Sequence, residues 1–593
     1  MPRAWMAAIG WLAAIGVLAI GRGRGRAQEI EAKQLPGLDA PVSATQETPP
    51  KSEVIPYPTK EVVEGLQRAE ADGDGCCCPS GFDWSKVPPI YVTPRTGCFA
   101  ITPSGPGYYS ARDVLEHNYR EKPPKYPTLP PFVSPRFTPF FDADYRYLDD
   151  PNNTQFDFFD PIKRMHATPN SMLTLGGEER LRYMDEINSR LAGPNNKYLL
   201  TRSEVWADFW YKDRFRVFVE FFDARSTHQN LKPLAIDVDH ADFLDLFAEL
   251  KIVDFLDHPG YLRVGRQEML FGSQRLISTL DWANTRRTFD GARAYWHGDK
   301  FDADIFITQP VVPQVHNLDA PDSSILFGGV WTTYRPAKGQ FIDFYYLNIN
   351  NDDNVAPGAF NKKHVQVKGT YDTSTFGARV AGDYHNGLLW DFEGMYQFGD
   401  WSNQTTSAGA YTTGMGYNFA NVLFTPSFWI YYDWASGDQN PGFGQHGTFN
   451  QLFPFGHFYF AQIDDFGRQN IRDLNFQANF RLTPWIFTNV QYHILHLDSA
   501  KDALYGPQGA GLAPQGGAIE RQDKTGKSGT DIGQCLHWLT NFHLSQHQDI
   551  LIGYAHLFAG EYLKQAPTPG EAHVTPAQAR DAELFYVQYS FRW

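Results

Sequence analysis

Arginine and glutamate side chains recur at every second position in several short segments whose other residues are apolar. Arg180 and Arg182 alternate with Leu181 and Tyr183, and the next such segment carries Arg202. Successive side chains of a strand point to opposite faces, so each segment predicts one charged face and one apolar face. A guanidinium keeps its charge and offers several donors in one plane, which suits carboxylate binding. Two chemistries are therefore open for the charged face: ion pairs that brace a wall, and weak binding of a passing anion.

The apolar face of the predicted strands indicates whether the protein is surrounded by water or by lipid. The last predicted strand, residues 584–593, places five large apolar or aromatic side chains on one face. A soluble protein rarely ends in this way, whereas an outer-membrane barrel turns such a face to lipid and carries aromatic residues at its edges. A soluble sandwich or propeller is the alternative, because its strands alternate too. The five residues are Phe585, Val587, Tyr589, Phe591 and Trp593.

The alternating pattern predicts a single transmembrane antiparallel β-barrel. We identify about nineteen strand candidates from residue 171 to the end, and a barrel with both ends in the periplasm needs an even number. Assigning the candidate at 363–371 to a long outer loop leaves about 18 strands and makes the periplasmic turns short. The alternation then predicts these lumen-facing polar residues: Glu178, Arg180, Arg182, Arg202, Glu204, Asp208, Arg216, Glu220, Asp245, Glu249, Lys251, Arg263, Gln267, Arg293, Arg379, Asp391, Glu393, Asp473, Asn475, Asn479 and Arg481.

Composition narrows the class of protein. Aromatic residues make up 15% of the 593 residues, and the formal net charge of −15 argues against nucleic acid as a partner. After residue 20 no apolar run is long enough for a helical membrane span. The sequence predicts no cofactor and no metal site, because its five cysteines lack the paired spacing of metal ligands.

The first 165 residues differ from the rest. Residues 1–27 resemble an export signal, with Arg3, an apolar stretch and a small-residue exit at Ala27. Residues 28–165 contain about half of the 40 prolines, which predicts a largely irregular periplasmic extension. Its aromatic end, near 137–159, would either plug the barrel or lie along its periplasmic rim. The barrel itself is assigned to residues 166–593, in the outer membrane of a Gram-negative-type envelope.

Four motifs in order carry a family resemblance. Residues 261–268 read YLRVGRQE and are followed by DWAN at 281–284 and RRTFDG at 286–291. Later segments at 393–399, 435–441 and 448–454 continue the series. This arrangement resembles the alginate export family of outer-membrane proteins and covers about residues 166–593.

The resemblance implies an 18-stranded pore that passes an anionic uronate polysaccharide outward through an arginine-lined constriction. The strand before the GRQ motif carries two acidic residues, Asp245 and Glu249, and one basic residue, Lys251. The sequence therefore leaves a polysaccharide, an oligosaccharide and a small anionic solute open as substrates. A general porin is the alternative function. The residues predicted along the substrate path are Arg180, Arg182, Arg202, Arg263, Arg266, Gln267, Arg275, Arg286, Arg287, Arg293 and Arg379.

Two other classes of function compete with a pore. His543 and Ser545 share a strand face, as in an outer-membrane hydrolase, but the neighbouring residues of that motif are missing. A structural envelope protein would instead bind a periplasmic partner through residues 28–165. We therefore predict that the chain is not an enzyme. The partners that we predict are an anionic polysaccharide or small solute and outer-membrane lipid, and residues 28–165 leave a periplasmic partner open.

Overall fold

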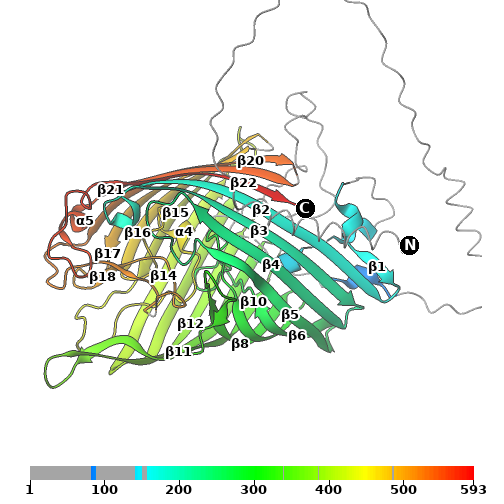
Figure 1. Ribbon diagram of the computed structural model, residues 1–593, viewed down its shortest axis with the longest axis horizontal. Coiled ribbons are helices and arrows are strands. Elements are labelled where there is room, and N and C mark those ends of the chain that lie inside the picture. The colour runs from blue at the N-terminus through cyan, green and yellow to red at the C-terminus, as the bar shows by residue number, and fades with distance from the viewer. Residues whose placement is uncertain are drawn as a thin grey trace, which may run out of the picture. The chain divides into compact units, whose positions relative to one another are not determined.

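The computed structural model describes residues 82–88, 140–143, 145–149 and 157–593, apart from residues 338, 385, 484–485, 514 and 546. Within this part of the chain, 18 antiparallel strands form a closed barrel, which confirms the predicted fold (Figure 1). The barrel closes where β2 (Ser171–Ile187) pairs with β22 (Ala582–Arg592). The other wall strands are β3 (Asn196–Tyr211), β4 (Phe215–Thr227), β5 (Asp239–Phe255), β6 (His258–Gln267), β7 (Phe289–His297), β8 (Phe301–Val312), β10 (Ile325–Tyr334), β11 (Gln340–Phe360), β12 (Gln366–Asp383), β13 (Leu388–Trp401), β14 (Gln404–Asn418), β15 (Ser427–Ala435), β16 (Ile471–Thr483), β17 (Ile486–Leu497), β20 (Asp531–Ser545) and β21 (Gln548–Ala559).

Short elements flank this wall. None of the helices in the described residues is long and apolar enough to cross a membrane. The signal segment, most of the proline-rich extension and four of the five cysteines lie outside the described residues. The short elements are β1 (Met165–Thr168), β9 (Ala320–Pro321), the hairpin of β18 (Ala503–Tyr505) and β19 (Ile519–Gln522), α4 (Gly456–Tyr459), α5 (Glu561–Gln565), η1 (Trp84–Lys86), η3 (Phe140–Asp142), η4 (Arg146–Asp149), η5 (Asp160–Ile162) and η6 (Ser189–Leu191).

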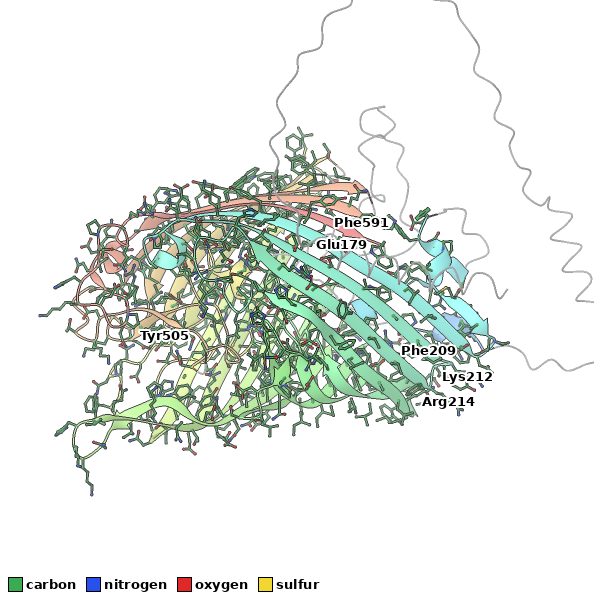
Figure 2. All side chains as sticks on the ribbon, in the orientation of Figure 1. Glu179, Phe209, Lys212, Arg214, Tyr505 and Phe591 are labelled. Atoms are coloured by element: carbon green, nitrogen blue, oxygen red, sulfur yellow. The ribbon has the colours of Figure 1, made fainter. Side chains whose placement is uncertain are left out.

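The two faces of the wall follow the predicted alternation. In β22, Phe585 is 37% exposed on the outer face, whereas Tyr586 beside it is 2% exposed and points inward. Phe209 on β3 lies on the same outer face, which carries a broad band of exposed apolar side chains (Figure 2). Outer-membrane barrels turn a face of this kind to lipid. A charged side chain on that face would cost about 2–4 kcal/mol at the membrane midplane, which explains why the charged residues lie on the inner face.

The barrel has a short-turn end and a long-loop end. Lys212 and Arg214 mark the short-turn end, where β3 and β4 are joined by residues 212–214 (Figure 2). Tyr505 marks the long-loop end, which carries the connections 268–288, 436–470 and 498–530. The terminal strand β22 finishes at the short-turn end, because it runs antiparallel to β2.

The strand number is confirmed, but the loop predicted at 363–371 is wrong. Residues 366–371 form the first part of β12, so that two predicted strands are one. The β11–β12 ladder continues past Asn351, which pairs with Tyr371, to Pro357, which pairs with Lys368. Backbone pairing does not require an apolar face, and this polar hairpin therefore extends farther at the long-loop end than alternation alone indicates.

Two long connections fold into the barrel, and we call them the first inward loop (268–288) and the second inward loop (436–470). Phe271 of the first loop lies between Phe306 and Trp331 of the wall, with both ring centroids 5.5 Å away. Phe453 of the second loop packs on Phe289, 5.1 Å between centroids. An outer loop with so many apolar residues is stabilised by withdrawing them from water.

The inward loops also contact each other. The backbone N–H of Phe453 donates to the carbonyl of Leu276 at 2.9 Å, and that of Phe455 donates to Gln274 at 2.9 Å. Ile277 and Phe453 form an isolated parallel bridge. In this conformation the middle of the lumen is therefore a packed core that joins both loops to the wall.

Candidate functional site in the lumen

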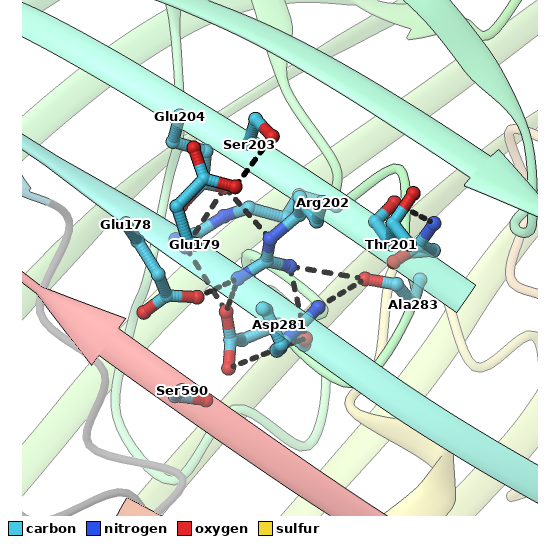
Figure 3. Close-up of polar contacts among 12 residues, drawn as sticks. Glu178, Glu179, Thr201, Arg202, Ser203, Glu204, Asp281, Ala283 and Ser590 are labelled. Carbon is cyan, nitrogen blue, oxygen red and sulfur yellow. Dashed lines mark hydrogen bonds and ion pairs between the residues drawn. The ribbon is translucent and has the colours of Figure 1, made fainter. Parts of the chain in front are cut away.

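Arg202 on β3 is the centre of the largest charged network. Its side chain is fully buried and contacts three carboxylates: Glu178 of β2 at 2.9 Å, Glu204 of β3 at 2.9 Å and Asp281 of the first inward loop at 2.8 Å (Figure 3). Alternation on β2 and β3 brings the two glutamates inward, and the pairing of the strands sets Arg202 opposite Arg180. Two guanidinium groups so close together are stable only with carboxylates between them.

Asp281 supplies the carboxylate that the wall arginines share. Besides Arg202, it pairs with Arg180 at 3.3 Å and with Arg286 of its own loop at 3.0 Å. Backbone carbonyls of the same turn add to this anchor, because Arg180 also donates to the carbonyls of Asp281 at 2.9 Å and Ala283 at 3.2 Å. Arg286 is itself held by Glu268 at 2.7 and 2.8 Å. The network thus fastens the first inward loop to β2 and β3.

A second network fastens the same loop to the opposite strands. Arg275 contacts Asp391 at 2.7 Å and Glu393 at 2.8 Å on β13. Arg379 on β12 shares Asp391 at 2.8 Å and reaches Asp343 on β11 at 3.4 Å. The predicted pairing of Asp391 with Arg379 is therefore present, and Arg275 enters it from the loop.

A third network lies nearer the short-turn end and includes the N-terminal segment. Glu249 on β5 accepts from Arg263 at 2.8 Å and from Arg216 at 3.1 Å. Phe141 packs edge-on against the lumen-facing Phe247 at 5.2 Å, and the Arg263 guanidinium lies 4.1 Å from both rings. Arg216 also donates to the carbonyl of Phe141.

The aromatic segment before the barrel was predicted either to plug the lumen or to lie along the rim. Its parts do both: Phe141 is 2% exposed inside the barrel, whereas Phe159 packs at the rim on Phe591 and Trp593, 5.9 and 6.3 Å between centroids. Irregular backbone at Phe141 can follow the lumen because the wall residues there are aromatic as well as charged.

Two of the predicted path arginines have no carboxylate partner within 4.0 Å among the described residues. Arg182 donates to the Gln588 side chain and to the Trp282 carbonyl, and it stacks on the Trp282 ring at 3.8 Å. Arg287 donates only to the carbonyls of Ser278, Pro454 and Gln508. Arg287 and Arg286 line a small cavity near the long-loop end. These two guanidinium groups are thus held by carbonyl, amide and ring contacts within the described part of the chain.

The three remaining predicted residues occupy two different settings. Arg293 is buried on the lumen side and pairs with Asp304 at 2.6 Å. Gln267 is buried on the same side, and its side-chain amide donates to the backbone carbonyls of Gly265 and Gly291. Arg266 differs from the expectation of a lumen position. It pairs across the ladder with Leu246, which is 45% exposed on the outer face.

The period of two in β6 accounts for this difference. Arg263 and Gln267 are buried on the lumen side, so Arg266 occupies the alternate position and faces outward, and the ladder with β5 runs through Gly265 without a register shift. Arg266 binds Asp290 at 2.9 and 3.1 Å at the long-loop end, away from Arg263.

Several residues of these networks were not singled out by the sequence. Asp281 stood inside a recognised motif without an assigned role, and Glu268 was not placed in the lumen. Arg592, which pairs with Glu178, was hidden in the terminal strand. The sequence did contain a pattern that could have indicated the loop residues. The long connection at 268–288 mixes charged with apolar residues, which is unusual for a loop that lies in water.

The family assignment follows from the sequence match. Residues 171–574 match the family described as alginate export, which is more than half of the chain. This protein belongs to the alginate export family. The family and the barrel are those of outer-membrane transport proteins, and the recognised motifs include both the first inward loop and part of the second. No curated protein matches the sequence.

Solved structures with a similar chain course include proteins of Pseudomonas aeruginosa and Acinetobacter baumannii. Pseudomonas aeruginosa OpdO has 13% identity and a TM-score of 0.45, covering 71% of this chain and 97% of that chain. P. aeruginosa OccK8 (OprE) has 11% identity and a TM-score of 0.46, covering 71% and 98%. Acinetobacter baumannii OccAB2 has 9% identity and a TM-score of 0.45, also covering 71% and 98%.

Proposed function

We propose that this member of the family is an outer-membrane pore for a hydrophilic, uronate-type anion, either a polysaccharide or an oligosaccharide. The contacts of Asp281 carry the proposal. Its carboxylate lies where Arg180, Arg202 and Arg286 converge, at 3.3, 2.8 and 3.0 Å. A uronate carboxylate has the same charge and geometry, so Asp281 occupies the position that such a group would take once the loop moves.

Competition with a tethered carboxylate favours a substrate with many carboxylates. Asp281 is held near its arginines by its own loop, which gives it a high effective concentration. One free uronate competes poorly against it, whereas a chain of uronates can engage several cationic sites in turn. The available candidates for the first contacts are Arg287 beside the cavity and Arg182 below the Trp282 ring. A series of weak sites lets a charged chain pass without being trapped.

The proposal also assigns sides to the barrel. We place the short-turn end in the periplasm, because outer-membrane barrels have short periplasmic turns and longer external loops. The proline-rich extension would then lie in the periplasm, and its segment with Phe141 would obstruct the lumen from that side. A periplasmic partner that removed this segment would clear the short-turn side of the lumen, and movement of the inward loops would still be needed to open the middle.

The test is the ionic current of the full-length protein refolded into planar bilayers. We expect an anion-selective current that uronate oligomers block, with longer oligomers blocking at lower concentration. Arg287→Gln and Arg182→Gln should each raise the blocking concentration about tenfold, as expected for one charge-assisted hydrogen bond. Lys197→Gln removes an exposed cation at the long-loop end and serves as the matched control.

Three outcomes separate the alternatives. A cation-selective current that ignores uronates would leave a general porin. Equal effects of all three substitutions would indicate surface charge alone. If the wild type passes no current, Asp281→Asn supplies the open form for the same blocking measurement, and an open form indifferent to uronates would refute the proposal.

A further inference from the structure

Three carboxylates converge at the long-loop end, apart from the lumen networks. Asp239 and Asp242 lie at the beginning of β5, and Asp319 directly precedes β9. One carboxylate oxygen of each lies within 4.8 Å of the other two. The three residues come from segments about eighty positions apart, so tertiary structure and not local sequence brings them together.

Asp239 is the residue that points to a ligand. It is 0% exposed, and within the described part of the chain neither of its carboxylate oxygens has a hydrogen-bond donor. Its neighbours are better satisfied: the N–H of Phe243 donates to Asp242 at 2.6 Å, the N–H of Asp319 also donates to Asp242, and the N–H of Gln314 donates to Asp319 at 2.6 Å. A buried carboxylate without a donor, facing two others, is costly unless a cation compensates it.

The protein supplies little positive charge here. Arg266 approaches Asp242 only to 3.8 Å. Its shorter contacts, at 2.9 and 3.1 Å, are to a fourth carboxylate, that of Asp290. Among the described residues, Arg266 is the one guanidinium paired with this group, so one positive charge faces four carboxylates.

We propose that Asp239, Asp242 and Asp319 bind a calcium ion. Oxygen ligands alone select a hard cation. Ca²⁺ holds its ligands at 2.3–2.6 Å, so opposite ligands are about 5 Å apart, whereas around Mg²⁺ they are about 4 Å apart. Three carboxylate oxygens within 4.8 Å of one another can all reach a Ca²⁺ ion, which also accepts irregular ligand geometry more readily than Mg²⁺.

Bound calcium would fasten the β8–β10 connection to β5. Asp319 belongs to that connection and lines the cavity that also contains Arg286 and Arg287. Arg266 donates to the backbone carbonyl of Asp319 at 2.8 Å, which already holds the peptide in place. The site is therefore reachable from the long-loop end and its ligands are held by backbone contacts. Affinity in the range of extracellular calcium modules, about 10⁻⁴–10⁻³ M, is expected.

The test measures the thermal unfolding of the full-length refolded protein in detergent, with chelator and with calcium. We expect Tm to rise by about 1–3 °C at about 10 mM Ca²⁺, since a ligand bound only to the folded state stabilises it. Mg²⁺ should produce a smaller shift. Asp239→Asn should abolish the calcium shift, while its Tm in chelator stays equal to or above that of the wild type, because one of the repelling charges is gone. Calorimetric titration with Ca²⁺ gives the stoichiometry.

Asp523→Asn is the matched control, because Asp523 lies in another loop at the same end and accepts from Thr525 and Ser528. Its calcium shift should equal that of the wild type. The proposal would be overturned by a wild type that shows no calcium shift, or by an Asp239→Asn variant that keeps it. A wild type that gains stability on mild acidification and ignores calcium would show instead that Asp239 and Asp319 share a proton.

Discussion

Removal of the Asp281 charge should open the barrel. In Asp281→Asn the three arginines lose their common carboxylate, but not equally. Arg202 keeps Glu178 and Glu204, and Arg286 keeps the two oxygens of Glu268. Arg180 keeps none within 4.0 Å among the described residues, so the substitution leaves about one unpaired buried charge in the closed state.

The size of the effect follows from that single charge. Removing one partner of a buried ion pair costs about 3–5 kcal/mol. The cost falls on the closed state, since a released loop exposes Arg180 to water. The ratio of closed to open barrels should therefore fall by between about two and four powers of ten. We expect a large rise in single-channel open probability in planar bilayers, limited only by full opening.

The control is Asp185→Asn, which removes a carboxylate that pairs with the exposed Lys197. An exposed pair contributes little, so its current should match that of the wild type. Heat-modifiable migration on gels verifies that each variant forms a barrel. The reasoning would be refuted if folded Asp281→Asn showed the wild-type current, because the Arg275 network and apolar packing would then suffice to hold the first inward loop.

Three further results are expected. Phe141→Ala should destabilise the packing of its segment by about 3–5 kcal/mol. Limited proteolysis should then cut near residue 141 at far lower protease concentration and leave the barrel intact. An unchanged cleavage pattern would mean that the Phe141 ring does not hold the segment. Gly177→Ala should lower the yield of refolded barrel measured on gels, because an added Cβ would lie 2.3 Å from the carbonyl oxygen of Glu204 on β3 and 2.7 Å from the Trp593 ring. A normal yield would contradict the geometry. Burial raises the pKa of Asp523, but hydrogen bonds from Thr525 and Ser528 outweigh this and lower it to about 2. A lowered pKa gives stability that is present above the unfolded value and is lost as pH falls towards 2, so the difference in Tm between the wild type and Asp523→Asn should disappear between about pH 4 and pH 2; a constant difference would exclude this titration.

The sequence predicted what depends on local alternation and missed what depends on contacts between distant segments. Arg180 and Arg202 could be placed inside because each strand carries its own pattern. Asp281 could not be paired with Arg202, 79 residues away, because nothing local shows that a loop turns inward. Arg266 was assigned to the lumen from its motif, whereas the period of two that places Arg263 and Gln267 inside places Arg266 outside. Roles along a substrate path stay predictions for all these arginines.

The irregular segment before the barrel shows a different limit. Its aromatic content indicated contact with the barrel, but periodicity is absent, so no face could be assigned. Phe141 lies in the lumen because Phe218 and Phe247 provide a matching surface, and that surface is formed by two wall strands. The cluster of Asp239 with Asp319 is similar, since each residue alone is an ordinary acidic residue near a strand end.

The pairing of β2 with β22 has a consequence for how the molecule is assembled. In every other neighbouring pair, the two wall strands follow each other along the chain and can pair as a hairpin. The contact between Glu178 and Arg592, in contrast, joins residues 414 positions apart. Pairing of such distant segments carries the largest entropic penalty and comes late in folding. Until then the sheet has two unsatisfied edges, each able to accept a foreign strand. The period before this junction forms is when the chain is most open to misassembly and most accessible to any factor that guides it into the membrane.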